Sequence, residues 1–258
     1  MRLITRKLED EDVKFLAAFE EALYTSVSEG MSENTIWFHR NQRCLYLSFN
    51  SSLLYADTDY ARELKIPITR RKYFVGKKTS IVLGGTGFTL DIYAKNIGYE
   101  KINNDYCNGF WNFVMRDLID IETKGNDIVI KGTDRKIVGS ISSNKENMVA
   151  VTSLVLEKLP SDIDLERLFK MPEEKFIDKE VNSVEERMTS LYSETGQTFD
   201  DAILKEKAIE YFESIGETIK DETDFNEHEY DLVDKLREKH ISEEWIKYAR
   251  ISTKPDFI

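Results

Sequence analysis

The sequence contains few of the residues and patterns that mark disordered, secreted or membrane-spanning chains. Its 258 residues include only 4 prolines and no low-complexity tract, which argues against long disordered segments. No stretch approaches the roughly 20 consecutive apolar residues that a membrane-spanning helix needs. The first apolar residues are interrupted by Asp10, Glu11 and Asp12, which argues against a signal peptide. We therefore expect a cytoplasmic protein without a membrane partner.

Cysteine and histidine are also scarce. The 2 cysteines, Cys44 and Cys107, show neither a metal-binding nor a redox spacing, so we expect them to be reduced thiols. The 3 histidines are isolated and have no Asp, Ser or Cys partner at a recognisable spacing. The sequence therefore supports neither a metal cluster nor a nucleophilic triad.

Charge is present in quantity, but the two signs are distributed unevenly. The net charge is −12, and residues 157–258 carry 15 Lys and Arg against 28 Asp and Glu. Residues 1–156 hold 21 basic and 20 acidic side chains. A negative field repels phosphate backbones, so we expect no nucleic-acid partner. The acidic third is either a solvated helical surface or a docking site for a basic partner.

Apolar spacing predicts strands in the first part of the chain and mostly helices in the last part. Strands are expected at 2–6, 35–40, 44–49, 66–70, 79–92, 127–131, 136–141 and 148–156, and helices at 9–28, 58–64 and 104–119. After a polar break at 190–198, the best candidate linker, two longer helices and a capped turn at 242–245 follow. This order predicts an α+β domain at 1–190 and a small helical C-terminal extension at 198–258.

The segment 126–140 carries the most functional information. It predicts two short strands joined by a polar turn, with Lys136 opening the second strand and Gly139-Ser140 ending its apolar run. A lysine fixed there offers a rigid point charge, and Asn126 and Asp127 can hold a polar ligand beside it. The same spacing also suits an ordinary hairpin with an exposed lysine.

This pattern, Asn-Asp, a hairpin and then Lys-hydrophobic-x-Gly-Ser, resembles the core of the lipoate–protein ligases. Further segments resemble that family in the family's own order. They are the opening hairpin at 34–47, the helix and strand before the paired arginines at 59–71, the segment after the last core strand at 172–188, and the ending of the short archaeal-type ligases at 236–245. Because the order is collinear over residues 30–250, the chain is identified as a member of this family.

The resemblance implies the class-II synthetase-like fold of biotin and lipoate ligases, a mixed, mostly antiparallel sheet flanked by helices. It implies that ATP activates lipoate or octanoate to an acyl-adenylate, which is transferred to a lysine of a lipoyl-domain or glycine-cleavage carrier protein. ATP, Mg²⁺ and lipoate or lipoyl-AMP are then the expected ligands. Lys136 would be catalytic, Asp127 would also bind Mg²⁺, and the substrate and ATP would contact Arg70, Arg71, Gly76, Lys77, Asn126, Asp127, Gly139 and Ser140. Some archaeal forms need a small separate accessory protein.

The chain departs from the family just after the paired arginines. The family places a serine or threonine and three glycines there, so that backbone N–H groups approach the adenylate. Here residues 72–78 read Lys-Tyr-Phe-Val-Gly-Lys-Lys, and only Gly76 keeps its place. The family's His-Asp pair and the asparagine after it are missing as well. These losses favour two alternatives to a ligase: a degenerate paralogue that binds a lipoyl or acyl group or a carrier protein without adenylation, or an ATP-independent lipoyl or octanoyl transferase.

Overall fold

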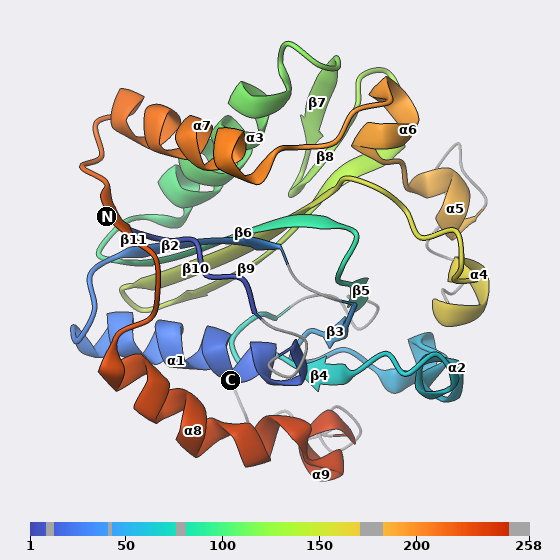
Figure 1. Ribbon diagram of the computed structural model, residues 1–258, viewed down its shortest axis with the longest axis horizontal. Coiled ribbons are helices and arrows are strands. Elements are labelled where there is room, and N and C mark those ends of the chain that lie inside the picture. The colour runs from blue at the N-terminus through green and yellow to red at the C-terminus, as the bar shows by residue number, and fades with distance from the viewer. Residues whose placement is uncertain (9–12, 41–42, 76–80, 171–182, 248–258) are drawn as a thin grey trace.

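The main feature of the structure is a mixed sheet. The structure is a computed structural model that describes residues 1–8, 13–40, 43–75, 81–170 and 183–247. Within these residues its eight strands run in the order β11 (Lys220–Glu222), β1 (Arg2–Ile4), β2 (Thr35–Arg40), β6 (Gly87–Lys95), β10 (Met148–Leu156), β9 (Lys136–Lys145), β8 (Asp127–Ile130) and β7 (Ile121–Lys124). Only β11–β1 and β1–β2 are parallel. The predicted mixed, mostly antiparallel sheet is confirmed (Figure 1).

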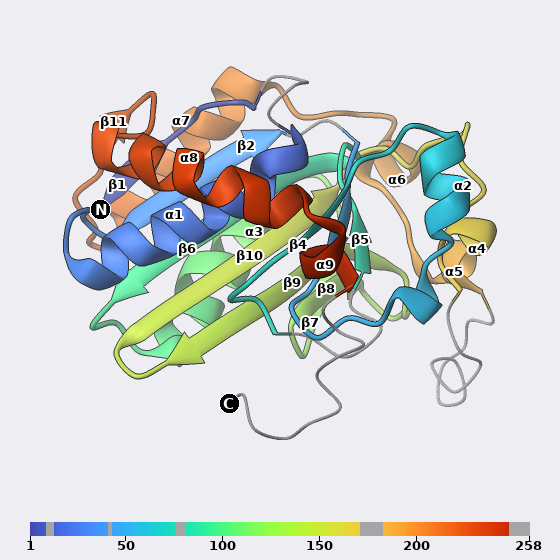
Figure 2. The same ribbon diagram turned by 90° about the horizontal axis from the view of Figure 1, so that it is seen from below.

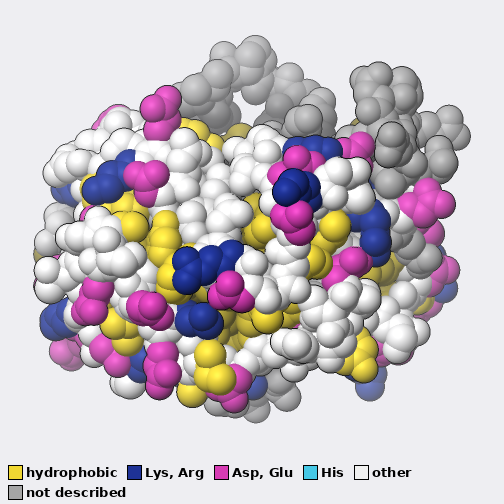
Figure 3. All heavy atoms as spheres, turned by 90° about the horizontal axis from the view of Figure 1, so that it is seen from above, with side chains coloured by type: hydrophobic (Ala, Val, Ile, Leu, Met, Phe, Trp, Pro, Cys, Tyr) yellow, Lys and Arg dark blue, Asp and Glu magenta, His cyan; other side chains and the backbone are white. Residues whose placement is uncertain are grey.

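One face of the sheet packs against a layer formed by η3 (a π-helix, Lys101–Asn108), α3 (Gly109–Met115) and α7 (Asp201–Ser214). Phe110 and Phe212 stack with their ring centroids 5.8 Å apart and so join α3 to α7. Seen from this side, basic and acidic side chains are interspersed rather than separated (Figure 3). The acidic C-terminal third therefore presents no single-sign surface on this face.

The opposite face packs against η1 (Val13–Phe15), α1 (Leu16–Glu29) and α8 (Glu227–Ile241), which is followed by α9 (Glu243–Lys247). The apolar spacing predicted for α1 is confirmed, because Phe19 and Leu23 are fully buried against the sheet. The helix, predicted to end at residue 28, ends at Glu29 and is capped by Gly30, whose φ of 79° is the left-handed conformation that glycine tolerates. Seen from below, α1 and α8 cross the sheet and leave β10 and β9 in view (Figure 2).

A second, smaller sheet lies at one end of the molecule. It has the order β4 (Ile68–Arg70), β3 (Leu45–Leu47) and β5 (Ile81–Leu83), with β3 parallel to β4 and antiparallel to β5. It shares a hydrophobic cluster with residues from η2 (Leu53–Tyr55), α2 (Thr58–Glu63), α4 (Leu165–Leu168) and α5 (Val184–Arg187). This sheet carries Arg70 to the face that α1 and α8 cover.

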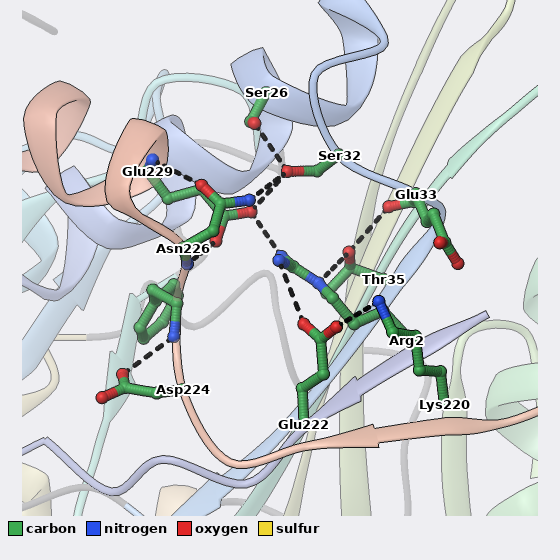
Figure 4. A network of polar contacts seen from close by, with 11 residues as sticks. Arg2, Ser26, Ser32, Glu33, Thr35, Lys220, Glu222, Asp224, Asn226 and Glu229 are labelled. Atoms are coloured by element: carbon green, nitrogen blue, oxygen red, sulfur yellow. Dashed lines mark hydrogen bonds and ion pairs between the residues drawn. The ribbon is translucent and has the colours of Figure 1, made fainter.

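The C-terminal residues are joined to the main sheet by a polar network. Arg2 of β1 forms ion pairs with Glu222 of β11, at 3.6 Å, and with the buried Glu229 of α8. Asn226 and Glu229 make a capping box that starts α8, and Ser32 donates to Glu229 at 2.8 Å (Figure 4). The segment predicted to be only helical therefore also supplies an edge strand, β11, and helices on both faces.

Much of the predicted linker at 190–198 is helical. Leu191–Thr195 form a helix, α6, and the Leu191 side chain is fully buried. The polar residues that suggested a break are caps, because the Ser190 hydroxyl accepts from Ser193 N–H and Gly196 adopts a φ of 73°. In the part of the chain that the structure describes, no helix combines the length and apolar character needed to cross a bilayer.

Candidate active site

The site around Lys136 is built on the sheet face that α1 and α8 partly cover. Side chains alternate along a strand, and Val138 lies in the core on the α3 side, so Gly139 faces the other way. Gly139 pairs with Asp127 of β8 and with Leu154 of β10, which places the three in one row. A bulge between Ile128 and Val129 shifts the register and brings Lys136 beside this row.

Lys136 and Asp127 form the centre of the site. The Lys136 Nζ atom lies 3.0 Å from Asp127 Oδ1, and the two side chains are 29% and 27% exposed. The lysine lies flat across Gly139: a Cβ atom at Gly139 would be 2.6 Å from Lys136 Cε and 2.7 Å from Nζ. The structure therefore brings together three of the predicted residues, with the ammonium group held and still within reach of a ligand.

Arg187 adds a second cation that sequence reasoning did not assign to the site. Its Nη2 atom lies 3.8 Å from Asp127 Oδ2, so Asp127 has a cation beside each oxygen. The backbone fixes this approach, because Thr189 N–H donates to Lys136 O at 2.9 Å and Met188 bridges Lys136 in parallel. The only signal in the sequence was a basic residue in the segment that resembles the family's stretch after the last core strand.

The side chains of two predicted residues contact groups other than Lys136. The Asn126 side chain is exposed and accepts from the Tyr99 hydroxyl at 3.4 Å. Ser140 follows Gly139 and therefore points to the opposite face, where its Oγ lies 3.6 Å from Cys107 Sγ of η3. Burial raises the pKa of the Cys107 thiol. The Ser140 hydroxyl and the Lys136 ammonium group thus lie on opposite faces of β9.

Arg70 is fully buried and engaged with backbone carbonyl groups. Its Nη1 atom donates to the carbonyls of Ser48, Phe49 and Ser51, each at 2.9 Å, and its Nε and Nη2 atoms donate to Ile246 O at 3.0 and 2.7 Å. Burial lowers the pKa of Arg70 to about 10. In this conformation a ligand phosphate would have to displace carbonyls that already satisfy the guanidinium.

Arg71 is the partner of a buried carboxylate. Its Nη2 atom lies 2.8 Å from Glu20 Oε1 of α1, and both side chains are almost fully buried. Burial raises the pKa of Glu20; Arg71 opposes this rise and Asp91 adds to it. Burial alone would lower the pKa of Arg71, but Glu20 and Asp91 outweigh it and raise the pKa. Arg71, predicted to contact the substrate or ATP, is thus held in a buried ion pair with Glu20.

The residues that replace the family's glycines fill space with side chains. The Tyr73 ring stacks on Tyr24 of α1 at 3.6 Å, and Phe74 is buried against Tyr93 and Arg71. Val75 is 49% exposed. The predicted ligand residues Gly76 and Lys77, and Lys78 beside them, lie outside the described residues.

The described residues offer little to a resident metal ion. No three His, Cys, Asp or Glu side chains among them gather closely enough to hold one. Asp127, the predicted Mg²⁺ ligand, has a cation beside each of its oxygens. Mg²⁺ prefers carboxylates together with water and phosphate oxygens, so this arrangement does not fit a metal held by the protein alone.

Comparison with known proteins supplies the identity of the fold. The solved structure of the bi-partite lipoate protein ligase of Thermoplasma acidophilum, described with its E2 lipoyl domain, superposes with a TM-score of 0.74 at 22% identity over 95% of this chain and 96% of that one. A lipoate-protein ligase A bound with ATP gives 0.73 at 20% identity over 95% and 98%. LipL1 of P. falciparum in complex with lipoate gives 0.72 at 14% identity over 100% and 76%. These likenesses show a shared fold.

Sequence comparison supplies the family. No protein in the curated set matches this chain. The family model of the lipoyl protein ligase A/B catalytic domain matches residues 12–213, which is most of the chain. The resemblance inferred from the motifs is thereby confirmed, and the chain belongs to the lipoyl protein ligase A/B catalytic domain family.

Proposed function

We propose that this protein is a lipoate–protein ligase, which activates lipoate or octanoate with ATP and transfers the acyl group to a lysine of a carrier protein. The observation that carries the proposal is the Lys136 ammonium group, held over Gly139 and beside Asp127 on the family's fold. Arg187 places a second positive charge next to it. Two partly exposed cations with one carboxylate between them suit a ligand that carries a carboxylate or a phosphate.

In the first step the acyl carboxylate attacks the α-phosphorus of ATP, an acyl-adenylate forms and pyrophosphate leaves. Lys136 would orient the carboxylate and then stabilise charge on the acyl oxygen. In the second step the amine of the acceptor lysine attacks the acyl carbon, loses a proton, and AMP leaves. Asp127 would keep the Lys136 side chain in place through both steps, since it is the anion that the ammonium group contacts.

Mg²⁺ would enter this reaction with ATP and neutralise charge on its phosphates. We assign Asp127 to Lys136 and Arg187 rather than to the metal, because both of its oxygens face cations. For the acceptor we propose a lipoyl domain or a glycine-cleavage carrier protein. The T. acidophilum ligase supports the first, because it is described with an E2 lipoyl domain, and its bi-partite organisation supports a separate accessory protein.

A second candidate function is favoured by the segment after β4. Arg70 is occupied by backbone carbonyls, and Phe74 fills space where the family keeps glycine. Both features weaken a phosphate site and leave the Lys136 group intact. An ATP-independent transferase that takes the acyl group from a lipoylated or octanoylated carrier would use Lys136 alone, and a degenerate binding protein would use it only to hold the acyl group.

Titration calorimetry with ATP·Mg²⁺, lipoate and lipoyl-AMP, followed by mass spectrometry of an apo lipoyl domain, tests these functions. A ligase binds lipoyl-AMP tightly and adds the lipoyl mass to the domain only when ATP is present. Acyl transfer from an octanoylated carrier in the absence of ATP would show that the protein is the transferase and not the ligase. Binding of the acyl group or the carrier without any mass shift would identify the degenerate paralogue.

A further inference from the structure

The corner between α8 and α9, residues 240–246, both donates hydrogen bonds to Arg70 and accepts hydrogen bonds from it. The Arg70 carbonyl accepts from the His240 ring at 3.0 Å and from Trp245 Nε1 at 3.0 Å. The Arg70 guanidinium in turn donates to Ile246 O through Nε and Nη2. Arg70 and His240 are fully buried, so water does not replace the bond between them, while the bonds to Trp245 and Ile246 are part-buried. The corner therefore fixes both the backbone and the side chain of Arg70.

The same end of α8 also reaches Lys72, through Glu21 of α1. Glu21 Oε2 contacts Lys239 Nζ at 2.6 Å and the His240 ring at 2.8 Å, and Glu21 Oε1 accepts from Lys72 Nζ at 2.8 Å. Three positively charged or hydrogen-bonding groups thus converge on one buried carboxylate. The corner holds residue 70 directly and residue 72 through this carboxylate.

The Arg70 guanidinium is also linked to Phe74, through the backbone of Phe49. Its Nη1 atom donates to Phe49 O, and the N–H of Phe49 donates to Phe74 O at 2.9 Å. The Arg71 N–H donates to Leu47 O of β3 at 2.9 Å. A continuous path of hydrogen bonds therefore runs from the α8–α9 corner through Arg70 to the buried Phe74, one of the residues that replace the family's glycines.

We propose that the α8–α9 corner is a positioning element for residues 70–74, with His240 and Trp245 as positioning residues that act through Arg70. The corner belongs to the last part of the chain, more than 165 residues after Arg70 in sequence. Its effect on ligand affinity rests on the proposed function, because residues 70–74 lead into the segment that the family uses for the adenylate. The effect of the corner on the backbone of residues 70–74 is independent of the proposed function.

Trp245→Phe tests the proposal because it removes the indole N–H and keeps an aromatic ring. Trp111→Phe is the control: it also loses one indole hydrogen bond, of 2.7 Å to Ser153, on the opposite side of the sheet. Amide hydrogen exchange is read at Arg71 and Phe49, whose N–H groups donate to Leu47 and Phe74. We expect exchange there to rise about fivefold in Trp245→Phe and to stay unchanged in Trp111→Phe. Equal exchange rates of the Arg71 and Phe49 amides in the two variants would overturn the proposal.

A pair of variants at His240 separates its two contacts. In His240→Asn the amide N–H₂ takes the place of Nδ1 and keeps a donor for Arg70 O, and in His240→Gln the longer amide reaches towards Glu21 instead. We expect faster Arg71 exchange in His240→Gln than in His240→Asn. The reverse order would show that the contact with Glu21, rather than that with Arg70, transmits the effect.

Lipoyl-AMP affinity is measured on the same proteins. We expect Trp245→Phe to raise the Kd about fivefold and Trp111→Phe to leave it unchanged, although both variants lose one hydrogen bond. A wild-type protein that does not bind lipoyl-AMP would remove the proposed function, while the exchange measurements would still decide the role of the corner. Faster exchange without a change in Kd would show that residues 70–74 do not contact the ligand.

Discussion

The side chain of Lys136 occupies the space that a Cβ atom on residue 139 would need. Cε and Nζ lie 2.6 and 2.7 Å from the position of that atom, closer than any real Cβ contact. The absence of a side chain at Gly139 therefore leaves the space in which the ammonium group lies beside Asp127. This relationship explains why a glycine three residues after the lysine belongs to the motif, although the glycine itself carries no chemical group.

Gly139→Ala should displace the ammonium group without unfolding the protein. The atoms that clash are the far end of a flexible side chain, so we expect a stability loss below about 1 kcal/mol. A displacement of about 1 Å in a catalytic group can cost about 100-fold in rate, and we expect a loss of that size in acyl transfer. Gly98→Ala is the control, since a Cβ there meets nothing within 4 Å. Equal activities of the two variants would show that the position of Lys136 is irrelevant.

Lys136→Ala should abolish most acyl transfer and leave the melting temperature nearly unchanged. Removing one preorganised charge costs about 3 kcal/mol in transition-state stabilisation, which is more than 100-fold in kcat/KM. A partly exposed ion pair contributes at most about 1 kcal/mol to stability. Lys131→Ala is the control, because Lys131 forms an exposed ion pair with Asp120 in the same hairpin. A large drop in melting temperature would instead support a structural role for Lys136.

Arg187 should contribute to ligand affinity rather than to folding. Its guanidinium faces Asp127 at 3.8 Å, a loose contact that a ligand anion would share. We expect Arg187→Ala to weaken lipoyl-AMP binding about tenfold, which corresponds to about 1.4 kcal/mol. Arg187→Lys keeps the charge and should recover part of the affinity, although it lacks the planar fork. The measurement is the Kd from calorimetry, and unchanged binding in Arg187→Ala would remove this residue from the site.

Sequence reasoning located β8, β9 and Lys136 because alternating apolar residues and a local motif lie within one hairpin. It missed β11, since the three residues Lys220, Asp221 and Glu222 show no apolar alternation and pair only because Arg2 and β1 lie beside them. It also missed the approach of Arg187 to Asp127, which are 60 positions apart in the chain. Contacts of this kind depend on how the sheet and the following segments pack, and one sequence carries no direct record of them.

The same limit explains the paired arginines. Their position next to an apolar strand was visible, but the groups that satisfy them were not. Glu20, the partner of Arg71, lies on α1, and the carbonyls that hold Arg70 come from the loop after β3 and from α9. A pair of arginines in a sequence is therefore equally compatible with a phosphate site and with a buried structural network.

Replacing the side chains of residues 74 and 75 by glycine should have very different costs. Phe74 is 1% exposed and packs on Tyr93 and Arg71, so we expect Phe74→Gly to destabilise the fold by about 4 kcal/mol. Val75 is 49% exposed, and Val75→Gly should cost no more than about 1 kcal/mol. Urea unfolding measures both. Similar losses in the two variants would show that Phe74 is not part of the core.

Glu21 should give the stability a dependence on acid pH. Burial alone would raise its pKa, but hydrogen bonds from His240, Lys239 and Lys72 outweigh burial and lower the pKa to about 2, from an ordinary value of 4.5. A carboxyl with a lowered pKa in the folded state stabilises the fold above the unfolded value, and this contribution is lost as the pH falls through the folded value. We expect about 3 kcal/mol to disappear between pH 4.5 and about 2.

Urea unfolding at pH 5.5, 4.5 and 3.5 measures this dependence. Glu21→Gln keeps the shape of the side chain and cannot ionise, so its free energy of unfolding should be lower at pH 5.5 and should fall less between pH 4.5 and 3.5. Glu213→Gln, at an exposed position of α7, is the control and should follow the wild-type curve. Parallel curves for Glu21→Gln and the wild type would mean that Lys72, Lys239 and His240 do not depend on the charge of Glu21. The α8 end would then be held by packing and by its hydrogen bonds to Arg70.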